Sequence, residues 1–129
     1  PFLDQRGEFV KTFHAPTLND IVGQFDLREE FFSVSRKHTL RGMHFQTPPA
    51  DHHKLVYCVT GSILDVLLDL RKGSSTYGQT YATELSAANR HMLWIPKGIA
   101  HGFLALMDDS CVIYKTDFEY APAHDAGIR

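Results

Sequence analysis

The chain of 129 residues has 13 basic and 15 acidic side chains, mixed along its length, and a formal net charge of −2. A chain of this length forms one domain with a sizeable core, and the weak, mixed charge argues against a protein that binds nucleic acid or a membrane surface. The sequence contains no long apolar run and no signal peptide, which predicts a cytoplasmic protein. Because it starts at Pro1 and stops at Arg129 without a natural start or tail, we expect further residues beyond both ends.

Short segments rich in β-branched and aromatic residues predict an all-β fold. Turn-forming clusters separate these segments. The one helix candidate is a turn or two within residues 15–25. Many short strands separated by turns favour a single-domain sandwich or barrel, the jelly roll included. The predicted strands are, in chain order, residues 8–13, 31–35, 40–45, 54–61, 62–70, 79–85, 91–96, 101–106 and 110–120.

Side-chain alternation along residues 54–61 places Lys54, Val56 and Cys58 on one face of that strand. Lys54 therefore continues an apolar face, although it could also extend from a sheet edge toward water. Cys58 and Cys111 each lie in an apolar segment, far apart in the sequence. We expect both to be buried free thiols rather than a disulfide.

Two acidic residues fall on a mostly apolar face of the strand predicted for residues 62–70. Asp65 and Asp69 are four positions apart and therefore point the same way. A buried acid needs a partner, and a salt bridge to Arg41 or Arg71 is the simplest one, which we favour for Asp69. Asp65 is equally compatible with a position inside a pocket.

Three histidines crowd one short stretch, which raises the question of a metal site. Two ligands on the same face of a strand must lie two residues apart, and Gln46 stands where a partner of His44 would be needed. His52 and His53 follow a proline-rich loop, and exposed loop positions are the favoured interpretation. His101 could reach the same cavity as His44. Two convergent histidines without a nearby third disfavour a metal.

Acid–base chemistry without a metal is the other interpretation of this stretch. Histidine suits a general base near neutral pH, which fits His44, and the permanently charged fork of Arg41 suits a phosphate. Lys54 could stabilise an enolate oxygen, and Tyr114 could be the matching acid. Each has a plainer explanation: an interior histidine, a lysine at a sheet edge, a core tyrosine. Their combination on one sheet is what favours the functional interpretation.

Five segments give the chain a resemblance to a known family. They read DQRGEFVKTF, LRGMHFQ, KLVYCVTGSILDVLLDLRKGSSTYG, LSAANRHMLWIPKGIAHGF and VIYKTDFEYAP, in this order. In sequence and spacing they resemble the motifs of dTDP-4-dehydrorhamnose 3,5-epimerase and its relatives, the nucleotide-sugar epimerases of the cupin superfamily. The resemblance runs from about residue 4 to the end of the chain.

The resemblance implies a cupin-type β jelly roll (a double-stranded β-helix) that forms a homodimer and uses no metal or other cofactor. The implied substrate is a nucleoside-diphosphate 4-keto-6-deoxyhexose of deoxysugar and polysaccharide biosynthesis. His44 matches the base that removes a proton next to the C4 carbonyl, and Lys54 matches the residue that stabilises the enolate oxygen. Tyr114 matches the acid that returns a proton to the opposite face and so inverts the carbon.

The same resemblance implies a set of substrate-binding residues. Arg6 and Arg41 match groups that bind the nucleotide diphosphate or the sugar, and His101 matches a substrate contact. Asp125 falls where the family has an acidic residue in the nucleotide region. In relatives the early strands pair with the sheet of the partner subunit, so Arg6 or Lys11 would act across the interface.

Three departures from the family pattern bear on the substrate. Glu29 and Phe31 stand where the family has Gln-x-Asn, and Lys11 replaces an acidic residue. These positions contact substrate in relatives, so we expect them to bind a different sugar or nucleotide. The aspartate that orients the family's base histidine would lie beyond residue 129, and Asp65 is a weak substitute for it. A single-centre epimerase or a keto-isomerase is therefore an alternative to double epimerisation.

Two other functional classes fit parts of the sequence. A metal-dependent cupin, a dioxygenase or isomerase, would use His44, His101 and His53 as ligands. A catalytically inactive cupin would bind a nucleotide sugar without exchanging its protons. The complete set of His44, Lys54 and Tyr114 argues against the inactive protein.

Overall fold

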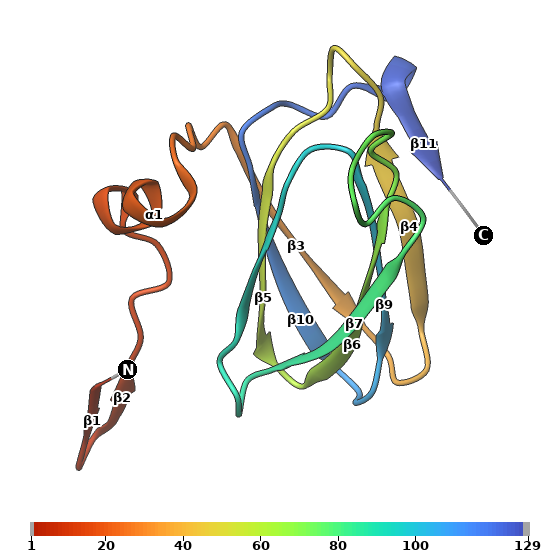
Figure 1. Ribbon diagram of the computed structural model, residues 1–129. Helices are drawn as coiled ribbons and strands as arrows, with labels where there is room; N and C mark the ends of the chain where they lie inside the picture. The colour runs from red at the N-terminus through yellow and green to blue at the C-terminus, as the bar shows by residue number, and fades with distance from the viewer. Residues whose placement is uncertain (1, 128–129) are drawn as a thin grey trace.

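The computed structural model describes residues 2–127. From β3 onward the chain forms a jelly roll of two antiparallel sheets packed face to face (Figure 1). The all-β prediction is confirmed. The first sheet has the strand order β3-β10-β5-β8 and the second the order β11-β4-β9-β6-β7. The strand bounds are β3 Glu29–Ser35, β4 Leu40–Gln46, β5 Lys54–Thr60, β6 Ser62–Asp69, β7 Thr80–Ser86, β8 Met92–Ile95, β9 Ile99–Ala105, β10 Ser110–Thr116 and β11 Asp125–Gly127.

The core lies between the sheets and is built from alternate residues of their strands. Val56 and Cys58 of β5 are buried in it, as the alternation predicts. They belong to one apolar cluster with Ile63 of β6 and Phe103 of β9. Lys54 is two residues before Val56, so the same alternation directs it into the end of this interior.

The predictions for the cysteines and for Asp69 can be compared directly with the structure. Cys58 and Cys111 are free thiols, as predicted, and Cys58 is buried. Cys111 is only half-buried, because a register shift in β10 begins there and such a bulge re-aims the side chain. Asp69 forms the favoured salt bridge, with 3.0 Å between its Oδ2 and Nη2 of Arg71. Hydrogen bonding from Arg71 holds the pKa of Asp69 well below its usual range.

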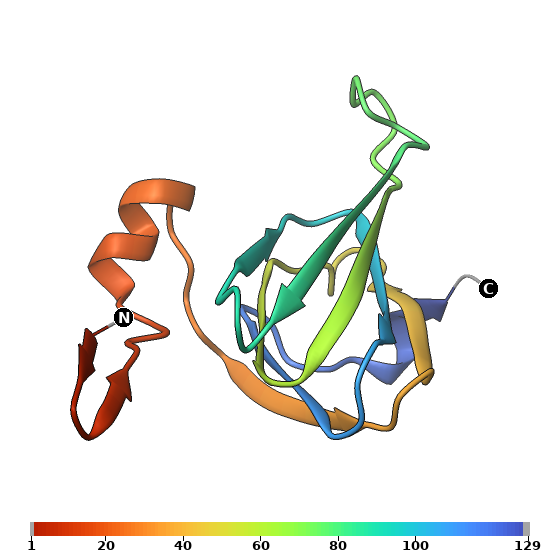
Figure 2. The same cartoon turned by 90° about the horizontal axis from the view of Figure 1, so that it is seen from below.

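An N-terminal arm lies beside the two sheets rather than within them (Figure 2). Helix α1 falls within the predicted segment, with Pro16 in its first turn, where proline is well tolerated. It ends before Gly23, whose φ is 86°. No helix among residues 2–127 is long and apolar enough to span a membrane. The arm comprises β1 Phe2–Asp4, β2 Gly7–Phe9 and α1 Ala15–Val22.

The strand predicted for residues 8–13 is wrong beyond Phe9, where β2 ends. Side-chain contacts hold the next residues on the outer face of the first sheet instead of in a strand pairing. The hydroxyl of Tyr57 donates to Oγ1 of Thr12 at 3.2 Å. Such contacts join residues far apart in the sequence, so a local strand pattern does not reveal them.

The strand predicted for residues 110–120 is also too long, since β10 ends at Thr116. Asp117 accepts the backbone N–H of His53 at 2.8 Å, and the ring Nδ1 of His53 lies 2.8 Å from its other oxygen. These bonds turn the chain out of the sheet. It then forms a short 3₁₀ turn and β11, which pairs with β4 and which the strand pattern does not predict.

A close approach of β4 to β9 gives a first testable prediction. Gly42 has a φ of 99°, and a Cβ there would lie 2.6 Å from the backbone oxygen of His101. We expect Gly42→Ala to lower the free energy of unfolding by about 2–4 kcal/mol, because the methyl group must push the strands apart. Denaturant unfolding measures this change. Gly73→Ala is the control, since Gly73 has a φ of 87° but open space around it; equal losses would contradict the explanation.

Candidate active site

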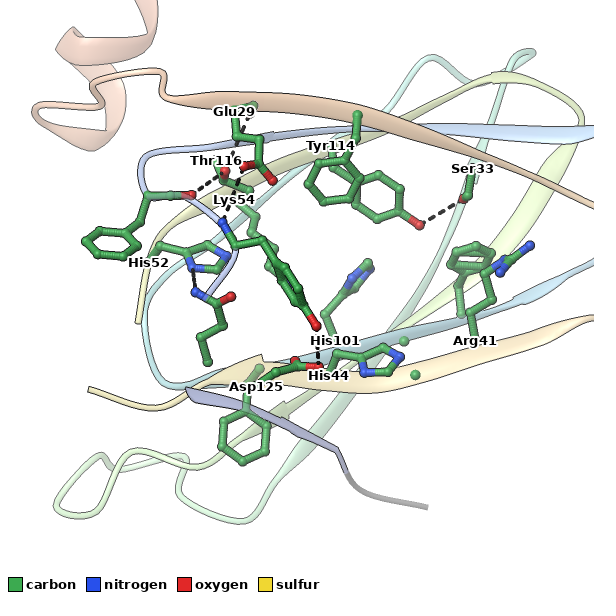
Figure 3. Close-up of a pocket in the computed structure, with 18 of the residues that line it drawn as sticks. Glu29, Ser33, Arg41, His44, His52, Lys54, His101, Tyr114, Thr116 and Asp125 are labelled. Carbon is green, nitrogen blue, oxygen red and sulfur yellow. Dashed lines mark hydrogen bonds between the residues drawn. The ribbon is translucent and has the colours of Figure 1, made fainter. Parts of the chain in front are cut away.

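A cavity of about 700 Å³ occupies one end of the space between the two sheets (Figure 3). Its lining comes from β3, β5 and β10 of the first sheet and from β4, β9 and β11 of the second. A mostly apolar cavity with a few convergent polar groups is typical of a small-molecule site. The predicted site residues that line it are Glu29, Phe31, Arg41, His44, Lys54, His101, Tyr114 and Asp125.

His44 and Tyr114 reach the cavity from opposite sheets. His44 lies on β4 and is exposed, and its ring makes no hydrogen bond within residues 2–127. Tyr114 lies on β10 and is 9% exposed. Figure 3 shows the two side chains on opposing walls of the cavity. A ligand carbon held between these walls would have an imidazole on one face and a phenol on the other.

The surroundings of Tyr114 keep its hydroxyl protonated. Burial raises the pKa of this phenol. Its oxygen lies 3.0 Å from Oγ of Ser33, and its ring stacks on Phe31 with centroids 4.7 Å apart. Tyr114 is thus a hydrogen-bonded core tyrosine that also lines the cavity. Sequence reasoning missed Ser33, although the alternation along β3 places it on the same face as Phe31.

Lys54 enters the cavity from the first position of β5. Burial lowers the pKa of its ammonium group, while the carboxylates of Asp125 and Asp65 act in the opposite direction. The alternative in which Lys54 extends from a sheet edge into water is therefore wrong. A cation in a partly desolvated cavity is well suited to stabilise a nearby negative charge.

His101 lies beside His44 and is bonded to a buried acid. The two histidines are opposite each other in the register of β4 and β9. His101 is 4% exposed, and its Nε2 lies 2.7 Å from Oδ2 of Asp65, which is fully buried. Asp65 therefore pairs with His101 rather than with Arg41. The idea that Asp65 orients His44 is wrong for the same reason.

Arg41 is exposed, lines the cavity and is held by two residues of β3, a strand of the other sheet. Its Nε donates to Oγ of Ser35 at 2.8 Å, and Nη2 donates to the backbone oxygen of Val34 at 3.3 Å. These bonds fix the guanidinium at the rim. A fixed, permanently charged fork in this place is suited to a phosphate group.

Two carboxylates lie on the side of the cavity away from Arg41 (Figure 3). Oε2 of Glu29 accepts the backbone N–H of Tyr120 at 3.3 Å. The hydroxyl of Tyr120 donates to Oδ2 of Asp125 at 3.4 Å. Tyr120 thus links the two acids and adds an aromatic ring to the lining, a contribution that sequence reasoning missed. Lys54 lies on this side as well, so charged groups of both signs line the cavity.

Arg6 and Lys11 are not brought to this cavity within one chain. Arg6 is exposed in the turn between β1 and β2. Lys11 lines a separate groove of about 580 Å³ between the arm and the outer face of the first sheet. A role for either residue at the cavity would require a second chain.

His52 and His53 are half-buried, which corrects the expectation of exposed loop positions. His52 lines the cavity with Nδ1 3.2 Å from the backbone oxygen of Ala50, and burial lowers its pKa. His53 does not line the cavity, and its ring stacks on Trp94 with centroids 5.2 Å apart. The two side chains point apart, as expected, but protein covers both sides of the chain here.

The histidines do not assemble into a metal site. Within residues 2–127, no three His, Cys, Asp or Glu side chains gather closely enough to hold a metal ion. His44 and His101 share the cavity, whereas His53 is bound to Asp117 elsewhere. The ligand set considered for a metal-dependent cupin is therefore not brought together.

Comparisons with known proteins agree with this fold. The sequence profile described as dTDP-4-dehydrorhamnose 3,5-epimerase matches residues 1–129. The dTDP-4-dehydrorhamnose 3,5-epimerase of Shigella flexneri is 41% identical over 128 residues, covering 98% of this chain and 71% of the relative. The dTDP-6-deoxy-D-glucose-3,5-epimerase of Legionella pneumophila, solved with dTDP-4-keto-L-rhamnose, has a TM-score of 0.95 at 36% identity, covering 99% of this chain and 68% of that one.

A second solved structure adds a different specificity. It is a 3'-monoepimerase from Streptomyces bikiniensis in complex with dTDP-quinovose. The TM-score is 0.94 at 29% identity, covering 99% of this chain and 65% of that one. With the profile match over its whole length and a relative more than 40% identical, the chain belongs to the dTDP-4-dehydrorhamnose 3,5-epimerase family.

Proposed function

We propose that this chain is an isomerase that inverts C3, C5 or both in a nucleoside-diphosphate 4-keto-6-deoxyhexose. The substrate best supported is dTDP-4-keto-6-deoxyglucose, because the relatives are named for dTDP sugars and one was solved with dTDP-4-keto-L-rhamnose. One observation carries the proposal: His44 and Tyr114 line one cavity from opposite sheets. That placement is what inversion of a carbon requires.

The proposed mechanism passes through an enolate. The C4 carbonyl acidifies the hydrogens on C3 and C5, and His44 removes one of them from its side of the sugar ring. The electron pair moves to the C4 oxygen, where the ammonium group of Lys54 stabilises the negative charge. Tyr114 then returns a proton to the same carbon from the opposite face, and the centre is inverted.

The remaining residues of the lining would bind the substrate. Arg41 is proposed to hold the diphosphate, because its guanidinium is fixed at the rim of the cavity. His101 is proposed to contact the sugar beside His44. Glu29, Phe31 and Asp125 would contact the sugar or the nucleotide from the other walls.

We further propose a homodimer in which the N-terminal arm packs on the partner subunit. Leu3 and Phe9 of the arm are 76% and 61% exposed, and Phe32 of β3 is 68% exposed. Large apolar side chains exposed on a projecting arm favour burial against another chain. Arg6 and Lys11 would then reach the partner's cavity. The cytoplasm is the proposed location.

A product analysis tests the proposal and separates it from a single-centre epimerase, which the cavity-lining Glu29 and Phe31 favour as the second candidate. The protein is incubated with dTDP-4-keto-6-deoxyglucose, borohydride reduces the ketone, and acid releases the sugars for identification. Rhamnose and its C4 epimer indicate two inversions, and sugars inverted at one carbon indicate a single-centre enzyme. Recovery of only the uninverted sugars would indicate an inactive cupin. A keto-isomerase is recognised by reduction with borodeuteride, because the label then enters at C3 instead of C4.

The pH dependence of turnover supplies a second prediction. Lys54 acts as a cation, and its pKa is lowered from 10.5, so activity is lost as the pH rises through a value below 10.5. Tyr114 acts as a neutral acid, and its pKa is raised from 10.0, so it stays protonated throughout this range. Of these two residues, Lys54 is therefore the one that contributes to the alkaline limb of the pH–rate profile.

The variant Lys54→Arg tests this assignment, because arginine remains charged at alkaline pH. We expect its alkaline limb to move to higher pH even if its maximal rate falls. Lys72→Arg, in an exposed loop, is the control. An alkaline limb that stays in place in Lys54→Arg would show that another group sets it.

A further inference from the structure

Asp65 is a fully buried residue that does not line the cavity. Its Oδ2 is bonded to Nε2 of His101 at 2.7 Å, and Oδ1 has no hydrogen-bond partner among the described residues. A carboxylate shielded from water needs an opposite charge within the protein. Because His101 is hydrogen-bonded directly to Asp65, it is the residue best placed to carry this positive charge.

The same hydrogen bond assigns roles to the two ring nitrogens of His101. An ionised carboxylate only accepts hydrogen bonds, so Nε2 carries a proton and donates it to Asp65. Nδ1 has no hydrogen-bond partner among residues 2–127. Figure 3 shows the His101 side chain rising from its strand into the cavity beneath Tyr114. Nδ1 is therefore the atom of this pair that can reach a ligand.

The groups that face the pair come from three further strands. His44 of β4 lies opposite His101 in register, and the ring of Tyr114 on β10 meets the His101 ring edge-on at 6.2 Å. Lys54 of β5 lies within range of the Asp65 charge, which opposes the effect of burial on the pKa of Lys54. One buried carboxylate thus acts on two basic groups that line the cavity, Lys54 and His101.

Three more charged side chains line the cavity without bonding to Asp65: Glu29, whose Oε2 accepts the backbone N–H of Tyr120, Asp125 and Arg41. Asp125 acts on Lys54, where it also opposes the effect of burial on the pKa. Arg41 acts on Tyr114, where it opposes the larger effect of burial, which raises the pKa. None of these side chains is hydrogen-bonded to Asp65. His101 therefore remains the residue that supplies the positive charge beside the Asp65 carboxylate.

We propose that Asp65 is a positioning residue that holds His101 as an imidazolium and aims its Nδ1–H at the C4 oxygen of the substrate. The inference rests on the proposed function, because it concerns the enolate that forms when His44 removes a proton. Lys54 and His101 would then both donate to the developing oxyanion. One preorganised donor of this kind contributes roughly 10²–10³-fold in rate. Asp65 acts through His101 and does not touch the substrate.

The charge state of the His101 ring can be measured independently of catalytic activity. Nitrogen-15 NMR of the histidine rings, assigned with His101→Gln, separates an imidazolium from either neutral tautomer. We expect both ring nitrogens of His101 to be protonated at pH 7.5, and only one of them in Asp65→Asn. A neutral His101 ring in the unmodified protein would overturn the proposal even if the enzyme is fully active.

Kinetics of Asp65→Asn supply the second test, since asparagine keeps a hydrogen-bond acceptor but removes the charge. We expect kcat to fall by about 10²-fold, KM to change little, and the alkaline limb to move to lower pH. Asp69→Asn is the matched control, because Asp69 is also buried on β6 but its partners are Arg71 and loop hydroxyls outside the cavity. A lower stability with an unchanged pH profile in Asp65→Asn would reduce Asp65 to a structural residue.

A double variant shows whether Asp65 acts through His101. Adding Asp65→Asn to His101→Gln should cost little further activity, whereas independent roles would give additive losses. If the variants fail to fold, the NMR result on the unmodified protein still decides. An unmodified protein that does not turn over its substrate would refute the proposed function, and the NMR result would then stand separately.

Discussion

Replacing His44 with alanine is expected to abolish epimerisation while leaving nucleotide binding intact. The variant removes the proposed base, which faces the cavity from β4, and a positioned base contributes about 10²–10⁴-fold in rate. The His44 ring makes no hydrogen bond within residues 2–127, so its loss should cost little stability. Turnover of dTDP-4-keto-6-deoxyglucose and calorimetric binding of dTDP measure the two properties separately.

The control for this variant is His91→Ala. His91 is exposed between β7 and β8 and does not line the cavity, so its removal should leave turnover unchanged. Near-normal turnover in His44→Ala would mean that another group abstracts the proton. His52 and His101 line the same cavity and would be the next residues to test.

Replacing Tyr114 with phenylalanine should separate proton removal from inversion. The variant keeps the ring that stacks on Phe31 but lacks the hydroxyl that is proposed to donate the proton. Because His44 is still present, deuterium from solvent should continue to enter the substrate. Inversion should slow by about 10²–10⁴-fold, since water must replace the acid on the opposite face.

Tyr81→Phe is a suitable control for the lost hydroxyl, because Tyr81 is exposed on β7 away from the cavity. Chromatography of the reduced products measures inversion, and mass spectrometry measures deuterium uptake. If Tyr114→Phe inverts the substrate at the normal rate, the acid must be another group.

Local sequence patterns predict the strands of the two sheets well, because alternation reports directly on burial between two layers. The face of β5 is an example, since Val56 and Cys58 lie in the core and Lys54 enters the cavity. The patterns fail after Phe9 and after Thr116. There the chain leaves the sheets through contacts such as Asp117 with His53, which are 64 positions apart. Periodicity carries no information about such contacts.

In the site, too, local sequence patterns predict some features, whereas contacts between distant residues are not predicted. Strand parity explains why Lys54 points inward, and the family resemblance suggests the roles of His44 and Lys54. Parity does not explain His44, because Arg41 and His44 are three residues apart and both line the cavity, with a register shift between them. The bond between Asp65 and His101 joins residues 36 positions apart on neighbouring strands. It depends on β6 lying beside β9 in one register, which the sequence does not reveal. For this reason the sequence pattern predicts which face of its strand Asp65 occupies, but it does not predict that Asp65 bonds to His101.

The proposed catalysis uses His44 and Tyr114 on opposite walls of the cavity. Its most direct test is proton NMR of dTDP-4-keto-6-deoxyglucose in D₂O with the purified protein. The measurement follows the signals of the hydrogens on C3 and C5 as solvent deuterium replaces them. We expect loss of at least one of these signals in the unmodified protein and retention of both in His44→Ala. Retention of both signals with the unmodified protein, under conditions where it binds dTDP, would contradict acid–base catalysis and favour an inactive nucleotide-sugar-binding protein.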